Sequence, residues 1–125
     1  RKIYLLVQNK RMIRMKTVNF STLDFQYNEK GLIPVIVQDE ISSQVLMMAW
    51  MNAKSLEQTV RTKNMVYWSR SRNELWIKGQ TSGNGQQLVE LMIDCDQDCL
   101  LAKVKQIGPA CHTKNKSCFY RAIDC

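Results

Sequence analysis

The 125-residue sequence lacks any long hydrophobic run. Its longest apolar stretch, residues 45–51, falls far short of the ~20 residues that a membrane-spanning helix requires, so we expect no membrane segment. We expect no signal peptide either, because the apolar run at residues 3–7 is short, is followed by further cations and has no small-residue cleavage pattern. These absences favour a cytoplasmic protein.

Acidic residues are missing from the first 16 positions, although the net charge of +7 invites a nucleic-acid interpretation. Beyond residue 16 the balance is 12 basic against 11 acidic residues. A nucleic-acid groove needs Lys and Arg spread over a folded face, so we expect no nucleic-acid partner. The chain starts at Arg1, and Met15 is a plausible natural start. We therefore interpret residues 1–14 as a leader or vector-derived basic arm and residues 15–125 as a single domain.

Cysteine and histidine are distributed in a way that argues against a disulfide framework. The five cysteines are odd in number and lie in the last quarter of the chain, whereas disulfide scaffolds usually have an even and more dispersed set. His112 is the only histidine. A metal site is the better explanation for such a cluster in a cytoplasmic protein.

Short β-rich segments dominate the rest of the chain, with one amphipathic helix. Asn52 is a good N-cap for a helix at residues 53–62. Two hairpins are predicted from residues 31–38 with 44–51 and 66–69 with 74–78, a third pair from 88–94 with 100–106, and a closing strand at 119–123. We expect an α+β fold with mainly antiparallel β structure, a barrel-like sheet and one or two short helices.

Three carboxylates, on Asp94, Asp96 and Asp98, alternate along the chain with Cys95 and Gln97. On an extended backbone, side chains at i and i+2 share a face and lie ~6.5 to 7 Å apart. Such acids repel one another unless a cation lies among them, and oxygen donors suit Mg²⁺ or Ca²⁺. The alternative is a solvated acidic turn.

Cys95, Cys111 and Cys118 have spacings unlike the paired knuckles of structural zinc sites, and no fourth ligand completes a closed set at that spacing. Three thiolates would leave the open position that a catalytic zinc needs for its water. They would also give the site a formal charge of −1, which opposes deprotonation of the bound water. We therefore infer that a nearby base helps to deprotonate the water or to hold the hydroxide. His112 is the candidate, although it could instead be structural or a fourth ligand.

These residues belong to a longer series of motifs, which are, in order, GLIPVIVQD (31–39), VLMMAWMN (45–52), SRSR (69–72), LW (75–76), KG (78–79), TSGN (81–84), DCDQD (94–98), GPACH (108–112) and SCF (117–119). Between about residues 31 and 121, this series resembles the phosphoribosyl-AMP cyclohydrolase family. Gln80 departs from the pattern, because many relatives have Glu there.

The resemblance implies a reaction, two metals and a homodimer. The reaction is hydrolysis of the N1–C6 bond in the adenine ring of 1-(5-phosphoribosyl)-AMP, giving the phosphoribosyl-formimino-aminoimidazole carboxamide ribonucleotide of histidine biosynthesis. Zinc-bound hydroxide would attack C6, with His112 managing protons. Cys95, Cys111 and Cys118 would hold zinc, and Asp94, Asp96 and Asp98 would hold magnesium, with ligands drawn from both chains of the dimer.

A further set of residues is expected to contact the substrate. The substrate has two phosphate groups, for which cations, hydroxyls and exposed backbone donors are suitable partners. The candidates are Arg70, Arg72, Lys78, Thr81, Ser82, Gly83 and Asn84. Alternatively, these cations only solvate a hairpin and the glycine-rich segment is only a turn.

Two other functions compete with the cyclohydrolase interpretation. A structural zinc module that binds nucleic acid predicts a closed zinc site and no use for three aspartates. A Mg²⁺-dependent phosphohydrolase predicts full activity after zinc removal. Neither explains why Cys95 interrupts the acids while Cys111 and Cys118 flank the only histidine.

Overall fold

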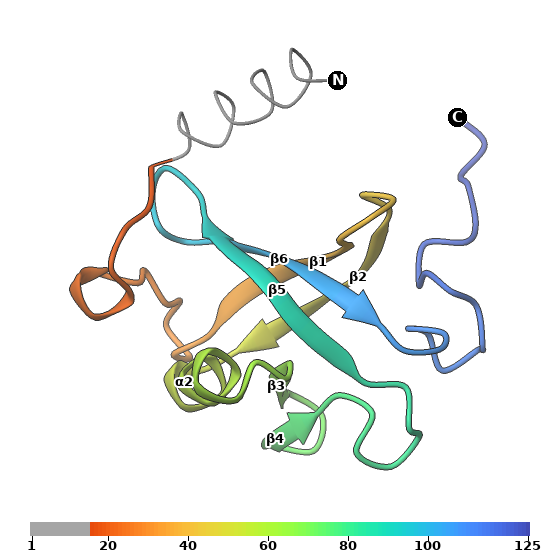
Figure 1. Ribbon diagram of the computed structural model, residues 1–125, viewed down its shortest axis with the longest axis horizontal. Coiled ribbons are helices and arrows are strands. Elements are labelled where there is room, and N and C mark those ends of the chain that lie inside the picture. The colour runs from red at the N-terminus through yellow and green to blue at the C-terminus, as the bar shows by residue number, and fades with distance from the viewer. Residues whose placement is uncertain (1–15) are drawn as a thin grey trace, which may run out of the picture.

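The computed structural model describes residues 16–125 (Figure 1). The leader assigned to residues 1–14, and Met15 at the expected domain start, lie outside the described residues. A 3₁₀ turn, η1 (Phe20–Thr22), precedes the sheet. None of the helices in the described part of the chain has the length and apolar character to cross a membrane.

The first predicted hairpin is confirmed. Strands β1 (Ile33–Asp39) and β2 (Val45–Met51) pair antiparallel, with Ile33 opposite Met51. The turn between them is closed by Asp39, whose carboxylate accepts hydrogen bonds from the backbone N–H groups of Ile41 and Ser42 and from the Ser42 hydroxyl. Alternate β1 residues face the core, as the period of a half-buried strand requires.

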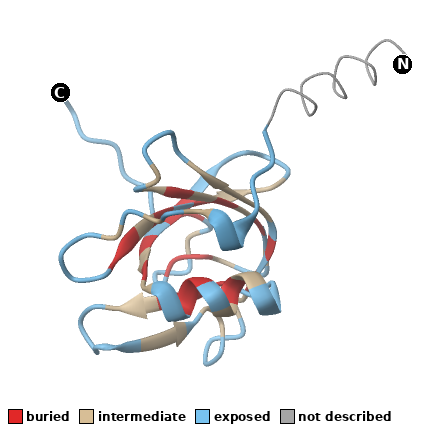
Figure 2. Ribbon diagram, turned by 90° about the vertical axis from the view of Figure 1, so that its left-hand side faces the viewer, coloured by how far each residue is buried: buried red, intermediate tan, exposed pale blue. Residues whose placement is uncertain are grey.

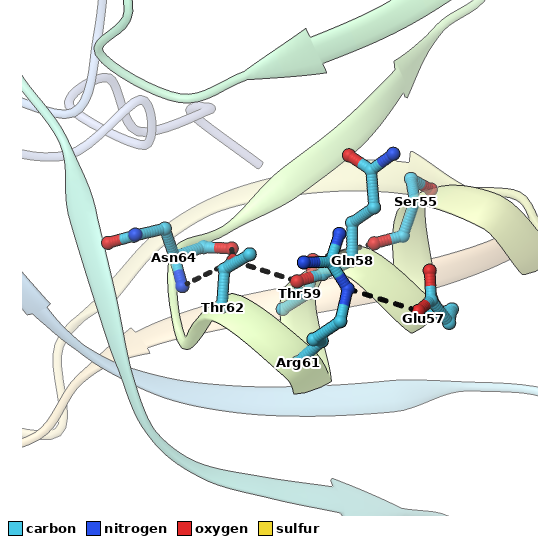
Figure 3. Close-up of polar contacts among 7 residues, drawn as sticks. All are labelled: Ser55, Glu57, Gln58, Thr59, Arg61, Thr62 and Asn64. Carbon is cyan, nitrogen blue, oxygen red and sulfur yellow. Dashed lines mark hydrogen bonds and ion pairs between the residues drawn. The ribbon is translucent and has the colours of Figure 1, made fainter.

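Helix α2 (Ala53–Thr62) has the predicted bounds. It begins with a capping box in which the Asn52 side chain accepts from Ser55 N and the Ser55 hydroxyl accepts from Asn52 N. Near its C-terminal end, the Thr62 hydroxyl donates to the Gln58 carbonyl and accepts from Asn64 N (Figure 3). The buried Thr59 hydroxyl accepts from Val66 N at 2.9 Å, which fixes the helix to the strand that follows.

The second predicted hairpin is also confirmed, and forms a separate two-stranded sheet of β3 (Val66–Ser69) and β4 (Glu74–Ile77). Strands β5 (Gln86–Ile93) and β6 (Leu100–Gln106) pair antiparallel as expected. The four-stranded sheet has the order β2-β1-β6-β5, in which β1 and β6 are parallel.

The prediction of mainly antiparallel pairing is confirmed, because only β1 and β6 pair in parallel, but the prediction of a barrel-like sheet is wrong. Over residues 16–125 the fold is α+β and mostly β with one α-helix. The four-stranded sheet is mixed and open, because β2 and β5 are its two edges and do not pair with each other. The closing strand predicted at 119–123 does not form. Phe119 and Ile123 are 63% and 87% exposed, and this segment pairs with no strand of the described structure.

The core lies between the inner face of the four-stranded sheet and the layer made by α2 and the β3–β4 hairpin (Figure 2). It also contains polar groups. The fully buried Tyr67 hydroxyl donates to Gln86, and the Gln86 amide donates to Gln106. Gln106 in turn donates to the backbone carbonyls of Gly85 and Ile107. This network joins the segments that leave β4 and β6.

The sheet has two distinct ends, and they carry different chemistry. At one end, β1 and β6 begin, and the turn at residues 94–99 joins β5 to β6. At the other end, β6 finishes and leads into residues 107–118, on the right of Figure 1. A seven-residue strand such as β6 spans roughly 20 Å, so these two segments lie about that far apart.

Candidate active site

The three aspartates converge, but not on the extended backbone that the sequence argument assumed. Strand β5 ends at Ile93, and residues 94–99 form a turn in which Gln97 has a positive φ of 64°. One oxygen from each of Asp94, Asp96 and Asp98 lies within 4.8 Å of the others. The prediction that they share a face therefore holds through turn geometry, and three exposed oxygens at this separation fit a hard divalent cation.

The carboxylates of this turn are electrostatically unequal. Asp94 Oδ1 accepts hydrogen bonds from the N–H groups of Asp98 and Cys99, at 3.0 and 3.1 Å. Partial desolvation opposes the ionised form, but these backbone hydrogen bonds outweigh it and lower the pKa of Asp94. Hydrogen bonding to Asp96 and then Asp94 raises the pKa of Asp98 to about 6. Such crowding is what a bound cation would relieve.

Cys111 and Cys118 meet at the opposite end of the sheet, close enough to affect each other's pKa. Cys118 is fixed to the first residues of β2, where its N–H donates to Leu46 O at 2.7 Å. The Thr113 hydroxyl donates to Cys111 Sγ at 2.9 Å and lowers the pKa of that thiol. Burial raises the pKa of the Cys118 thiol. The two sulfurs together fit half of a tetrahedral zinc site.

Cys95 lies in the acidic turn and not with this thiol pair. Within residues 16–125, the only group of three potential metal ligands within reach of one another is Asp94, Asp96 and Asp98. A single chain therefore does not bring the three predicted zinc ligands together. The predicted base, His112, is exposed and adjacent in sequence to the buried Cys111, so it lies on the side of the thiol pair.

The predicted substrate residues are divided in the same way. Arg70 and Arg72 lie in the β3–β4 turn, and Arg70 lines a cleft of about 300 Å³ together with Lys30, Leu32, Asn52, Trp68 and Asn73. This cleft is at the end of the sheet where β1 begins and β2 finishes. The Arg70 guanidinium also stacks over Trp50, 5.2 Å from the ring centre.

Thr81, Ser82, Gly83 and Asn84 belong instead to the cysteine end. They form the loop between β4 and β5, and the Asn84 side chain packs directly against Gly108. Gly108 has a φ of 69°, which favours glycine, and a Cβ there would displace the Asn84 side chain from this position. The TSGN loop therefore lies against the segment that carries Cys111 and His112.

The chain was compared with known proteins. Residues 47–120 match the family model described as phosphoribosyl-AMP cyclohydrolase. A protein of that name from Ruegeria sp. (strain TM1040) is 58% identical over 85% of this chain and 82% of its own length. Proteins of the same name from Paracoccus denitrificans (strain Pd 1222) and Cereibacter sphaeroides (strain ATCC 17025 / ATH 2.4.3) are 57% and 54% identical over 83% of this chain, and 86% and 87% of their own lengths.

The chain belongs to the phosphoribosyl-AMP cyclohydrolase family. The resemblance stated from the sequence motifs is thus confirmed. The same comparisons identify the chain as a member of a hydrolase family that acts in histidine biosynthesis.

Sequence reasoning missed several neighbours of the site in this cyclohydrolase-family chain. The Thr113 hydroxyl donates to Cys111 Sγ, and Ser117 is buried with its hydroxyl donating to Val45 O at 2.7 Å. A Thr two residues after a cysteine was the only available signal. Trp76, part of the LW motif, is partly buried and packs against the core. In the cleft, Lys30 has no sequence signal, and the sequence identifies Asn52 only as a helix N-cap within the VLMMAWMN motif.

Proposed function

We propose that this chain hydrolyses the N1–C6 bond of the adenine ring in 1-(5-phosphoribosyl)-AMP, in histidine biosynthesis, as a homodimer whose active sites each use residues from both subunits. Water adds across the bond: its oxygen ends on C6 as the carboxamide oxygen, and N1 takes a proton and is released as part of the formimino group. No ammonia leaves. Family membership supports this reaction over the two alternatives.

One observation carries the shared site. Cys95 and the Cys111–Cys118 pair lie at opposite ends of a strand roughly 20 Å long. A two-fold axis that brings the acidic turn of one subunit to the cysteine end of the other would complete the thiol set twice. The same movement would bring the Arg70 cleft of one subunit towards the TSGN loop of its partner. The zinc ligands and the candidate substrate contacts, each divided between the two ends of a single chain, would then come together.

The donor sets fit the implied metals. Asp94, Asp96 and Asp98 offer hard oxygens for magnesium, which would also bind substrate phosphate. Cys111 and Cys118 of one subunit with Cys95 of the other offer three sulfurs for zinc, which when bound would polarise the reacting water. His112, exposed beside Cys111, holds or transfers the proton that water loses. An alanine variant of His112 with normal turnover would remove that role.

Substrate orientation is assigned to the remaining candidates. Arg70 and Arg72 approach one phosphate group, and the hydroxyls of Thr81 and Ser82, with the backbone at Gly83 and the amide of Asn84, approach the other phosphate or a ribose. The cytoplasmic location, and the expectation of no nucleic-acid partner, remain predictions from the sequence.

Subunit complementation tests the proposal. Cys95→Ser and Cys111→Ser proteins are each expected to be inactive towards phosphoribosyl-AMP, measured by the absorbance change on ring opening. After the two are mixed and allowed to exchange subunits, each heterodimer has one site with all three thiols and one with two replaced. With random exchange, about a quarter of all sites are intact, so about a quarter of wild-type activity should return.

Two controls define the result. A mixture of Cys111→Ser with Cys118→Ser should stay inactive, because both ligands come from the same end of one chain. If activity returns there as well, or if the first mixture stays inactive while mixed dimers demonstrably form, the shared site is wrong. Phosphate release from nucleotides that survives complete zinc removal would instead favour the magnesium phosphohydrolase.

A further inference from the structure

Lys78 makes contacts within the protein that a phosphate-binding lysine would not need. The residue follows β4, and its backbone N–H donates to Met65 O at 3.0 Å. Its half-buried side chain runs towards the cysteine end, where Nζ donates to Ala110 O at 2.6 Å. Nζ also lies 5.3 Å from the centre of the Trp76 ring, which packs on the buried Tyr67.

Ala110 is the first residue of the small loop that carries the thiol pair. Its own N–H donates to Lys116 O at 3.1 Å, and Cys111 N donates to Asn115 O at 3.2 Å, which closes the loop. The far side of this loop is tied to β2 through Ser117 and Cys118. The near side is tied to the β3–β4 sheet by the Lys78 ammonium. Lys78 thus completes a two-sided attachment of the loop.

Charge gives the same residue a second effect. Because Lys78 Nζ is hydrogen-bonded to the carbonyl of the residue just before Cys111, its positive charge lies beside the loop that carries both thiols. Three thiolates around Zn²⁺ leave a formal charge of −1, and a partly desolvated cation beside two of them offsets it. An ammonium already bonded to Ala110 and packed on Trp76 would have to release both to reach a phosphate.

We propose that Lys78 is a positioning residue for the zinc ligands: it clamps the Ala110–Cys111 segment to the β3–β4 sheet and offsets the negative charge of the thiolate site. This inference rests on the zinc set of the proposed function. Supporting groups around metal ligands typically change metal affinity by about 10 to 100-fold when removed. Loss of Lys78 therefore acts on zinc binding before it acts on substrate binding.

The test measures zinc affinity directly, by competition with a chromogenic chelator on the purified full chain at pH 7.5. Lys78→Met, which keeps the aliphatic stem but neither charge nor donor, should bind zinc at least about tenfold more weakly than wild type. Lys78→Arg, which keeps both, should stay closer to wild type than the Met variant. Lys54→Met, at an exposed lysine on α2, is the matched control and should bind zinc as wild type does.

The outcomes separate the clamp from the phosphate contact. Unchanged zinc affinity in Lys78→Met, or a raised KM at saturating zinc with unchanged zinc affinity, overturns the proposal. If Lys78→Met does not fold by circular dichroism, Lys78→Gln replaces it and must show the same direction of change. Failure of the proposed function looks different, because wild type itself would then fail to bind zinc or to open the substrate ring.

Discussion

At the scale of single residues, the three aspartates of the acidic turn have different roles. Asp94 shapes the turn by accepting two backbone N–H groups, and Asp98 has its pKa raised to about 6 by its neighbours. Asp96 is exposed and has no such backbone role among the hydrogen bonds of the turn. Its substitution therefore tests cation binding with the least disturbance of the fold.

We expect Asp96→Asn to bind Mg²⁺ about tenfold more weakly or worse, because the number of charged oxygen ligands largely sets affinity for hard cations. Isothermal titration calorimetry on the zinc-loaded protein measures the change. Asp124→Asn, at an exposed aspartate near the C-terminal end, is the control. Equal Mg²⁺ affinities for Asp96→Asn and wild type would show that the acidic turn is only solvated.

At the scale of elements, the β1–β2 turn places the strand on which Ser117 and Cys118 are anchored. Hydrogen bonds from the Ser42 backbone and hydroxyl lower the pKa of Asp39, with a smaller contribution from the nearby Lys116. A lowered pKa in the folded state means that the ionised carboxylate stabilises the fold. That stabilisation is present above the unfolded pKa and is lost as the pH falls through the folded one.

Replacing Asp39 by Ala should lower the Tm at pH 7 by about 3 to 5 °C, as expected for roughly 1 kcal/mol of lost turn hydrogen bonding in a chain of this size. The difference from wild type should shrink as the pH falls below 3.8, the ordinary aspartate value. Thermal unfolding between pH 3 and 7 checks this, with Glu40→Ala alongside. A pH-independent difference would mean that turn geometry, not ionisation, matters.

At the scale of the whole molecule, the proposed zinc site takes its ligands from two subunits, so zinc would bind only to the assembled dimer. Mass action then makes the dimer more stable when zinc is present. The single chain also leaves apolar residues on the outer face of its sheet, where Ile36 is 37% and Met48 is 41% exposed. A second copy could cover such a face.

Zinc should therefore raise the fraction of dimer measured by sedimentation velocity at low micromolar concentration, and chelation should lower it. The Cys95→Ser dimer should respond much less, because it lacks the ligand that crosses between subunits. If Cys95→Ser and wild type respond equally to zinc, the metal does not bridge the subunits, and the three thiols have to be explained in another way.

The sequence by itself determined the local elements and the family. Helix α2 has its predicted bounds because Asn52 and Ser55 form a capping box and the apolar residues follow a helical period. The hairpins followed from alternating strands around polar turns, and the family followed from nine ordered motifs. These features depend on neighbours a few residues apart, which a sequence pattern records directly.

Only the tertiary structure decided how distant segments meet. The parallel pairing of β1 with β6 joins residues about 65 positions apart, and it places Cys95 and the Cys111–Cys118 pair at opposite ends of the sheet. The acidic turn closes through the positive φ of Gln97, and Lys78 reaches Ala110 across 32 positions. Strand order, turn conformation and side-chain reach are set by packing between elements, and local periodicity carries no information about them.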